Sequence, residues 1–251
     1  METPPARGAA FFDFDRTLLH GDAGVIFGMT LADWGYAQGR DLRGREFLRH
    51  HARTSATLAG KLATGITYKA LGAVGLLKRS RLVELSYRFL AGLPAGEMSA
   101  RMKQVWNERL RERIYPDMAR ILDDHRKAGR RIVIVTTGLR ELVEHARETL
   151  GGDVEVIGAE MLSTDGVWQG RVQGPLYGVH KAVAVRAWAE RNGIDLAESW
   201  AYSDHWSDLA FLSVVGHPVA VNPQLRLALH ARKKGWSVVY VLPPSRPEAK
   251  K

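Results

Sequence analysis

Residues 9–19 constrain the fold more than any other stretch. Four apolar residues there run directly into two carboxylates, Asp13 and Asp15, which are one residue apart. An uninterrupted apolar run that ends in charge is typical of a strand buried on both faces of a parallel sheet. The carboxylates then lie at the carboxyl end of the strand, the edge where open parallel sheets bind ligands. Two such groups resist joint ionisation unless a cation lies between them or one keeps its proton.

An isolated Asp-x-Asp sequence also has a purely structural explanation. Asp is common in turns, and a polar turn after a strand that caps the next segment needs no chemistry. A functional interpretation of Asp13 and Asp15 therefore depends on matching residues further along the chain.

The bulk composition indicates a packed globular protein. The chain has 251 residues, of which 45% are apolar, and it contains no cysteine. A disulfide framework, a cysteine zinc site and a cysteine nucleophile are thereby excluded. The first residues lack the apolar stretch of a signal peptide, and no uncharged run reaches the roughly 18 residues of a membrane span. We therefore expect a cytoplasmic location.

The positive charge is concentrated in one region. Residues 36–115 carry 16 Lys and Arg against 6 Asp and Glu, whereas the rest of the chain carries 20 against 21. A basic region is typical of proteins that bind nucleic acid, an anionic membrane surface or an anionic small molecule. Scattered Arg and Lys on a solvated helical surface give the same pattern without any partner.

Apolar strands and helices alternate from residue 115 onward, which predicts a parallel sheet flanked by helices. A hairpin is expected over residues 161–172, with Thr164, Asp165 and Gly166 in its turn. The expected strands are 131–138, 154–157, 199–203, 217–221 and 236–242, the expected helices are 118–128, 139–150, 181–192 and 223–234, and residues 243–251 form a tail.

The stretch between the first strand and residue 115 is expected to be entirely helical. Helical spacing places Leu82, Leu85 and Phe89 on one face, and Met98, Met102, Val105 and Leu110 on another, as in core packing. Residues 54–77, rich in Ala, Gly and Leu, either pack internally or face an apolar ligand. Because the first strand must join the later sheet, residues 1–19 and 116–251 form a Rossmann-like core, with a helical cap inserted at 20–115.

Four motifs in the expected order carry a resemblance to a known family. They are Asp13-Phe14-Asp15-Arg16-Thr17, residues 132–136 ending in Thr136, then Lys181, and residues 204–208 with Asp204 and Asp208 at their ends. With the cap-sized insertion after the first motif, the chain resembles the haloacid dehalogenase superfamily, in the subfamily that contains phosphoserine phosphatase. The resemblance covers the whole Rossmann-like core.

The resemblance implies phosphate ester hydrolysis. Asp13 would be the nucleophile that forms an aspartyl-phosphate, and Asp15 would protonate the leaving group and then activate water. Dehalogenating relatives lack the second carboxylate. Thr136 would donate its hydroxyl to a phosphate oxygen, with Thr137 as a competitor for that role, and Lys181 would screen the charge around Asp13.

The resemblance also implies a magnesium cofactor, because Mg²⁺ prefers hard oxygen ligands. Asp13, the backbone carbonyl of Asp15 and Asp204 would hold it, and Asp208 would orient waters or Lys181. Substrate contacts are expected from Phe14, Thr17, Asp22, Thr137 and Gly138. The fourth motif departs from the family at Ser203, His205 and Trp206, which leaves its carboxylates intact but alters the floor of the site.

The substrate is expected to be a small phosphorylated metabolite or a lysophospholipid-like ester. Asp22 stands where phosphoserine-specific enzymes are expected to carry a longer Glu, and the basic cap suits an anionic substrate with an apolar part. Phosphoserine is the alternative substrate. An alternative of another class is a basic protein that binds nucleic acid or a membrane surface without catalysis. Contact of the cap with an anionic membrane remains open, nucleic acid is not expected, and the chain does not reveal its oligomeric state.

Overall fold

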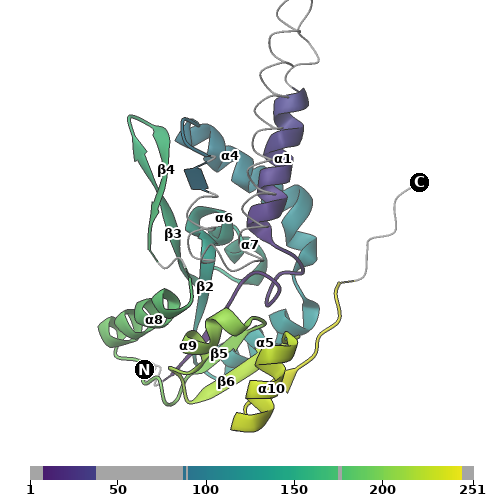
Figure 1. Cartoon of the computed structure of the whole chain (residues 1–251), viewed down its shortest axis with the longest axis vertical. Coiled ribbons are helices and arrows are strands. Elements are labelled where there is room, and N and C mark those ends of the chain that lie inside the picture. The colour runs from purple at the N-terminus through teal and green to yellow at the C-terminus, as the bar shows by residue number, and fades with distance from the viewer. Residues whose placement is uncertain (1–7, 38–86, 89, 175–176, 245–251) are drawn as a thin grey trace, which may run out of the picture.

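The computed structural model describes residues 8–37, 87–88, 90–174 and 177–244, and its centre is a seven-stranded sheet (Figure 1). The strand order is β4-β3-β2-β1-β5-β6-β7, and only β3 and β4 pair in antiparallel fashion. The strands are β1 (Ala9–Phe12), β2 (Arg131–Leu139), β3 (Glu155–Thr164), β4 (Val167–Gln173), β5 (Trp200–Ser203), β6 (His217–Val221) and β7 (Ser237–Val239).

Strand β1 is the buried centre of the sheet, as its apolar sequence predicts. It pairs with β2 on one side and with β5 on the other, in both cases parallel. All four of its residues are fully buried. Because side chains alternate between the two faces of a strand, Phe11 and Phe12 enter two different cores.

Helices cover both faces of this sheet, so the core has the predicted three-layer architecture. Phe12 packs with α5 (Pro116–Lys127), α6 (Arg140–Glu144) and α7 (Arg147–Leu150) on one face. Phe11 packs on the opposite face with α8 (Val179–Asn192), α9 (Leu209–Leu212) and α10 (Leu225–Lys234). The aromatic ring of Trp188 on α8 meets that of Phe11 edge-on at 5.5 Å.

The element boundaries differ from the sequence prediction in several places. The single helix predicted over 139–150 is wrong, because two short helices, α6 and α7, replace it. Strand β3 continues to Thr164, since its second half pairs with β4 in the hairpin. Strand β7 is shorter than predicted, and α10 begins two residues later than predicted. The predicted hairpin itself is confirmed.

Part of the predicted helical insertion is described. It comprises α1 (Ala23–Ala37), α4 (Ala95–Val105), a π-helical turn at Trp106–Leu110 and a 3₁₀ turn at Arg111–Arg113. The predicted core stripe along α4 and the π-helical turn after it is confirmed, because Met98, Met102, Val105 and Leu110 are all buried. Residues 54–77 and the stripe of Leu82, Leu85 and Phe89 lie outside the described residues, as does most of the basic region.

The β3–β4 hairpin holds the segment that leads into α4. The Gly92 amide donates a hydrogen bond to the Trp168 carbonyl at 2.8 Å, and the Trp168 amide donates to the Leu93 carbonyl at 2.9 Å. Gly170 lies so close to this segment that a Cβ there would come within 2.8 Å of the Ala91 Cβ. The described helices include none that is both long and apolar enough to cross a membrane.

Candidate active site

Four polar residues meet at the carboxyl edge of the sheet. Asp13 directly follows β1, Thr136 lies in β2, and Asp204 directly follows β5. Lys181 reaches the same place from the first turn of α8. The backbone binds the two central strands together here, because the Asp13 amide donates a hydrogen bond to the Tyr202 carbonyl at 2.9 Å. The topology thus joins residues from both ends and the middle of the chain.

Lys181 is a buried cation between two buried carboxylates. Its Nζ lies 2.5 Å from Asp13 Oδ1 and 2.8 Å from Asp208 Oδ2, and the residue is only 2% exposed. Burial alone disfavours the charge, but attraction to both carboxylates outweighs it and raises the pKa of Lys181. The ammonium is therefore fixed in place and permanently charged.

Asp13 is held at a defined position but is not fully neutralised. Its Oδ2 accepts a hydrogen bond from the Thr17 hydroxyl at 3.1 Å, while Oδ1 faces Lys181. Burial raises the pKa of Asp13 to about 6, with repulsion from Asp208 adding to the effect and Lys181 opposing it. The carboxylate is therefore ionised at neutral pH and is poorly solvated, as suits a nucleophile.

Asp15 has the opposite protonation preference. Burial, repulsion from Asp22 and repulsion from Asp13 raise its pKa to about 8, although a hydrogen bond from the Ala23 amide at 2.7 Å partly offsets them. The group therefore holds a proton at neutral pH. Two carboxyl groups with separated pKa values, one ionised and one protonated, are the arrangement that acid–base chemistry requires.

Asp204 and Asp208 complete the acidic edge. Burial raises the pKa of Asp204 to about 7, and repulsion from Asp13 adds to the shift, so the two carboxylates lie near one another. Asp208 is buried, and its Oδ2 accepts hydrogen bonds from Lys181 and from the Ser203 hydroxyl, the latter at 2.9 Å. The hydrogen bond to Asp208 gives the Ser203 hydroxyl a role at a position where the motif departs from the family pattern.

The donor set fits a hard divalent cation. The buried carboxyl groups of Asp13, Asp204 and Asp208 outnumber Lys181, the buried cation among the described residues of the site, so an added positive charge would relieve their repulsion. No three acidic, histidine or cysteine side chains among the described residues form a complete metal site by themselves. Mg²⁺ commonly binds through one or two carboxylates, with waters and substrate phosphate supplying the rest.

The residues expected to contact substrate have different surroundings. Thr136 is buried, and its hydroxyl oxygen accepts a hydrogen bond from the Gly138 amide at 2.9 Å. The side chain of Phe14 packs in the core, 6.3 Å from the ring of Trp106, so only its backbone remains for contact with a substrate. Thr17 is likewise fully buried, and its hydroxyl is used on Asp13.

Three more expected contacts lie at the start of α1 and in the last part of β2. Asp22 caps α1, since its Oδ1 accepts a hydrogen bond from the Val25 amide at 2.9 Å. It is near enough to Asp15 for repulsion to raise the pKa of that residue. Thr137 and Gly138 are both half-buried, in the last part of β2.

Tyr87 is a neighbour of the site that no sequence pattern singles out. Its hydroxyl donates a hydrogen bond to the Thr137 carbonyl at 2.6 Å, and the residue is 8% exposed. Burial and then the charges of Asp15 and Asp22 raise its pKa, so the phenol stays neutral. A single Tyr in an apolar helical stretch carries no signal of this contact, which only the tertiary structure creates.

Two histidines, His180 and His205, lie next to motif residues, directly before Lys181 and directly after Asp204. His205 lies half-buried in the fourth motif, where its Nδ1 accepts a hydrogen bond from the Ser207 amide at 3.0 Å. His180 is exposed on the first turn of α8.

Comparisons with known proteins give a consistent relationship. The profile of the haloacid dehalogenase-like hydrolase family matches residues 10–213. A phosphoserine phosphatase of Mycobacterium tuberculosis is 34% identical over 231 residues, which cover 92% of this chain and 70% of that protein. A histidinol-phosphatase of Neisseria meningitidis is 24% identical over 240 residues, which cover 93% and 98% respectively.

A solved structure shows the same likeness at the level of the fold. A substrate-bound phosphoserine phosphatase complex has a TM-score of 0.62 to this chain at 18% sequence identity. The match covers 95% of this chain and 94% of that one. The Rossmann-like architecture expected from the sequence is thereby confirmed.

Proposed function

Because the chain belongs to the haloacid dehalogenase-like hydrolase family and is a hydrolase of its phosphatase branch, we propose that it hydrolyses phosphate monoesters by way of an aspartyl-phosphate. The observation that carries the proposal is the pair of neighbouring carboxyl groups with opposite protonation preferences. Asp13 is ionised beside Lys181, and Asp15, two residues on, holds a proton.

In the first step an Asp13 oxygen attacks phosphorus and the bond from phosphorus to the ester oxygen breaks. The product is an acyl phosphate on Asp13, and the leaving alkoxide takes the proton of Asp15. Lys181, which touches Asp13, is placed to balance the negative charge that gathers on the phosphoryl oxygens. The Thr136 hydroxyl, at the same sheet edge, is a donor for one of these oxygens.

In the second step water attacks the same phosphorus. Asp15, now ionised, takes the proton from the attacking water, and the bond between phosphorus and Asp13 breaks. Inorganic phosphate is released and both carboxyl groups return to their starting states. Each proton that leaves Asp15 in the first step is thus recovered in the second.

Asp13 and Asp204, with the backbone carbonyl of Asp15, would hold a magnesium ion, and Asp208 would orient Lys181. When bound, this ion supplies positive charge to the phosphate oxygens and lowers the repulsion between the carboxylates. The support is the excess of buried carboxylates over buried cations at the site. Hard oxygen donors of this kind suit Mg²⁺ better than softer metals.

We propose a small phosphorylated metabolite as the substrate class. A lysophospholipid-like ester is the second possibility, because residues 54–77 of the cap sequence are rich in apolar residues. Phosphoserine is the alternative, because the M. tuberculosis relative is a phosphoserine phosphatase. The carboxylate of Asp22 caps α1, which weighs against its binding the amino group of phosphoserine.

A panel of phosphate esters assayed with Mg²⁺ tests the proposal. We expect phosphate release by the wild type, suppression by chelation of the metal, and loss of at least about a thousandfold in Asp13→Asn. Asp117→Asn is a matched control, since this aspartate is an exposed partner of Arg120 on α5. Equal phosphate release by wild type and Asp13→Asn would rule out the mechanism, and a strong preference for phosphoserine would overturn the substrate class.

A further inference from the structure

A second cavity lies at the opposite edge of the sheet from the carboxylates. Its volume is about 630 Å³, within the range of small-molecule sites. Trp200, His217 and Ser237, the first residues of β5, β6 and β7, form part of its wall. Asp204 follows the other end of β5, so the length of the sheet separates the two places.

Hydrogen-bond donors without protein partners line this cavity. They are the ammonium of Lys234, the imidazoles of His217 and His230, and the indole N–H groups of Trp200 and Trp236. Within the described part of the chain, these groups make no hydrogen bond or ion pair, although the rings touch other rings. The indole of buried Trp188 contrasts with them, because it donates to Glu155 at 3.1 Å.

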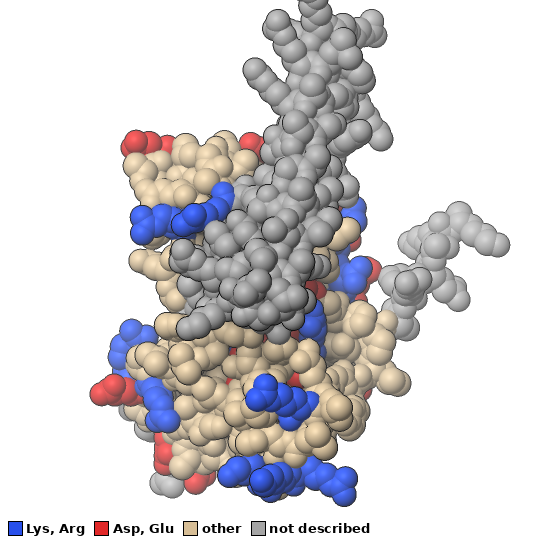
Figure 2. Space-filling model, viewed as in Figure 1, with Lys and Arg blue, Asp and Glu red and all other residues tan. Residues whose placement is uncertain are grey.

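The charge of the lining points to an anionic occupant. No residue of the cavity wall is Asp or Glu, whereas Lys234 contributes a full positive charge. Figure 2 shows Lys and Arg side chains gathered at the lower end of the molecule, where Figure 1 places α10, and this helix ends in Arg232, Lys233 and Lys234. A basic cavity without acidic residues favours anions by charge alone.

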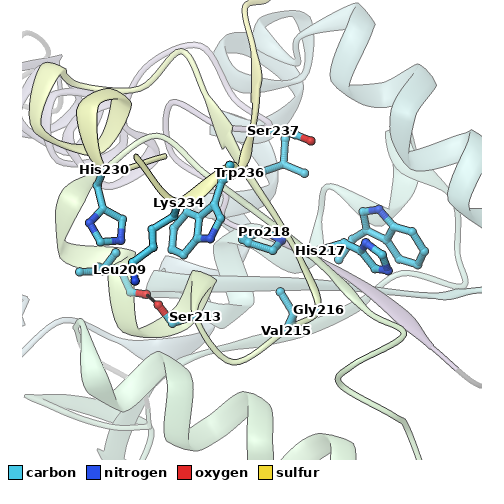
Figure 3. A pocket seen from close by; sticks show the side chains of 13 residues that line it. Leu209, Ser213, Val215, Gly216, His217, Pro218, His230, Lys234, Trp236 and Ser237 are labelled. Atoms are coloured by element: carbon cyan, nitrogen blue, oxygen red, sulfur yellow. Dashed lines mark hydrogen bonds between the residues drawn. The ribbon is translucent and has the colours of Figure 1, made fainter. Parts of the chain in front are cut away.

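The rings of the cavity favour a flat occupant. Figure 3 shows the indole of Trp236 in the middle of the cavity, between Lys234 on one side and Pro218 on the other. The ring of His230 meets this indole edge-on, with centroids 5.1 Å apart and planes at 73°, and the half-buried indole lines the cavity, so part of the ring is open to an occupant. Trp200 is already stacked on His217, with ring centroids 4.1 Å apart and planes at 14°. The exposed part of the Trp236 indole lies beside the ammonium of Lys234, which pairs with no acidic group among the described residues.

We propose that this cavity binds a small anion that carries a planar aromatic ring. The ring stacks on Trp236, and the anionic group, a phosphate or a carboxylate, is bound by Lys234 and the His230 imidazole. The site takes no part in the hydrolysis proposed for Asp13, so it binds its ligand whether or not the chain is catalytically competent.

Calorimetric titration of the Asp13→Asn chain tests the site, since phosphate ligands would not be consumed. The probes are adenosine 5′-monophosphate and 1-naphthoate, with methyl phosphate as the anion without a ring and naphthalenemethanol as the ring without a charge. We expect saturable binding of one or both aromatic anions below about 1 mM, and at least tenfold weaker binding of both control molecules.

Variants then locate the binding. Lys234→Gln should weaken it about tenfold, because a charge-assisted hydrogen bond is lost, and Trp236→Leu should do the same through lost stacking. Lys233→Gln removes the same charge from the next position on α10, which does not line the cavity, and should change the dissociation constant less than twofold.

The proposal fails if Lys234→Gln and Lys233→Gln weaken binding equally, or if methyl phosphate binds as tightly as the aromatic anions. It also fails if neither aromatic anion binds saturably up to about 1 mM. Because Lys234 is exposed, its replacement leaves the core intact and keeps the test independent of folding.

Discussion

Replacing Lys181 with methionine removes the buried cation of the site while keeping most of the volume of its side chain. The ammonium contacts Asp13 at 2.5 Å and Asp208 at 2.8 Å, and the side chains of these carboxylates are 10% and 5% exposed. In the variant, the buried carboxylates of Asp13 and Asp208 lose the positive charge that lies between them. The expected result is a large loss of stability that has no equivalent at the surface.

The magnitude follows from the burial of all three groups. Forming a buried ion pair yields little net stability, because desolvation of the charges opposes their attraction, but removing one partner costs about 3–5 kcal/mol. The free energy of unfolding of a domain is about 5–15 kcal/mol, so this loss is a large part of it. Lys127→Met is the matched control, because Lys127 pairs with Asp124 at 3.8 Å on an exposed surface. Exposed pairs contribute about 0–1 kcal/mol.

Urea denaturation at neutral pH with a metal chelator measures both variants on the same scale. We expect the free energy of unfolding to fall by about 3–5 kcal/mol in Lys181→Met and by less than about 1 kcal/mol in Lys127→Met. Similar losses in the two variants would refute the claim that burial decides the contribution of an ion pair at this site.

Three further outcomes are expected. Burial lowers the pKa of His125, which is hydrogen-bonded to Tyr202, to about 4, so the unfolded chain binds the extra proton below pH 6.5. The contribution of His125 to stability should fall from pH 6.5 toward 4 by as much as about 1 kcal/mol per pH unit, so His125→Gln should gain stability relative to the wild type over this range in urea titrations. Gly170→Ala should cost about 1–3 kcal/mol more than Gly166→Ala in the same assay: both backbones have φ near +70°, but only Gly170 would clash with the cap segment. A smaller cost at Gly170 would argue against the close approach. Mg²⁺ should raise the melting temperature of the wild type in a calorimetric scan by binding the folded state, and Asp204→Asn should reduce that shift; an equal shift in both would place the ion elsewhere.

The fold was largely predictable because its signals are local. Four consecutive apolar residues predict the buried strand β1, and the alternation of strands and helices after residue 115 predicts the parallel sheet. The long helix predicted over 139–150 failed because its apolar spacing does not show where the chain breaks between α6 and α7. Helix ends depend on tertiary contacts more than on propensity.

The candidate site was predictable in its residues but not in its protonation. The order of the motifs brings Asp13, Asp15, Lys181 and Asp204 to one sheet edge, which sequence reasoning can anticipate. That Asp13 is ionised and Asp15 protonated depends on burial and on neighbouring charges, which only the folded arrangement defines. The contact of Tyr87 with the Thr137 carbonyl, between residues 50 positions apart, has no sequence signal.

The sequence by itself determined which stretches form the strands and which carboxylates follow them, because both follow from apolar patterning and residue type. The tertiary structure decided which of them share a cation, which keep a proton, and where unpaired donors meet in a second cavity. These properties depend on distances between residues remote in the chain and on exclusion of water, and neither quantity is encoded in any local stretch.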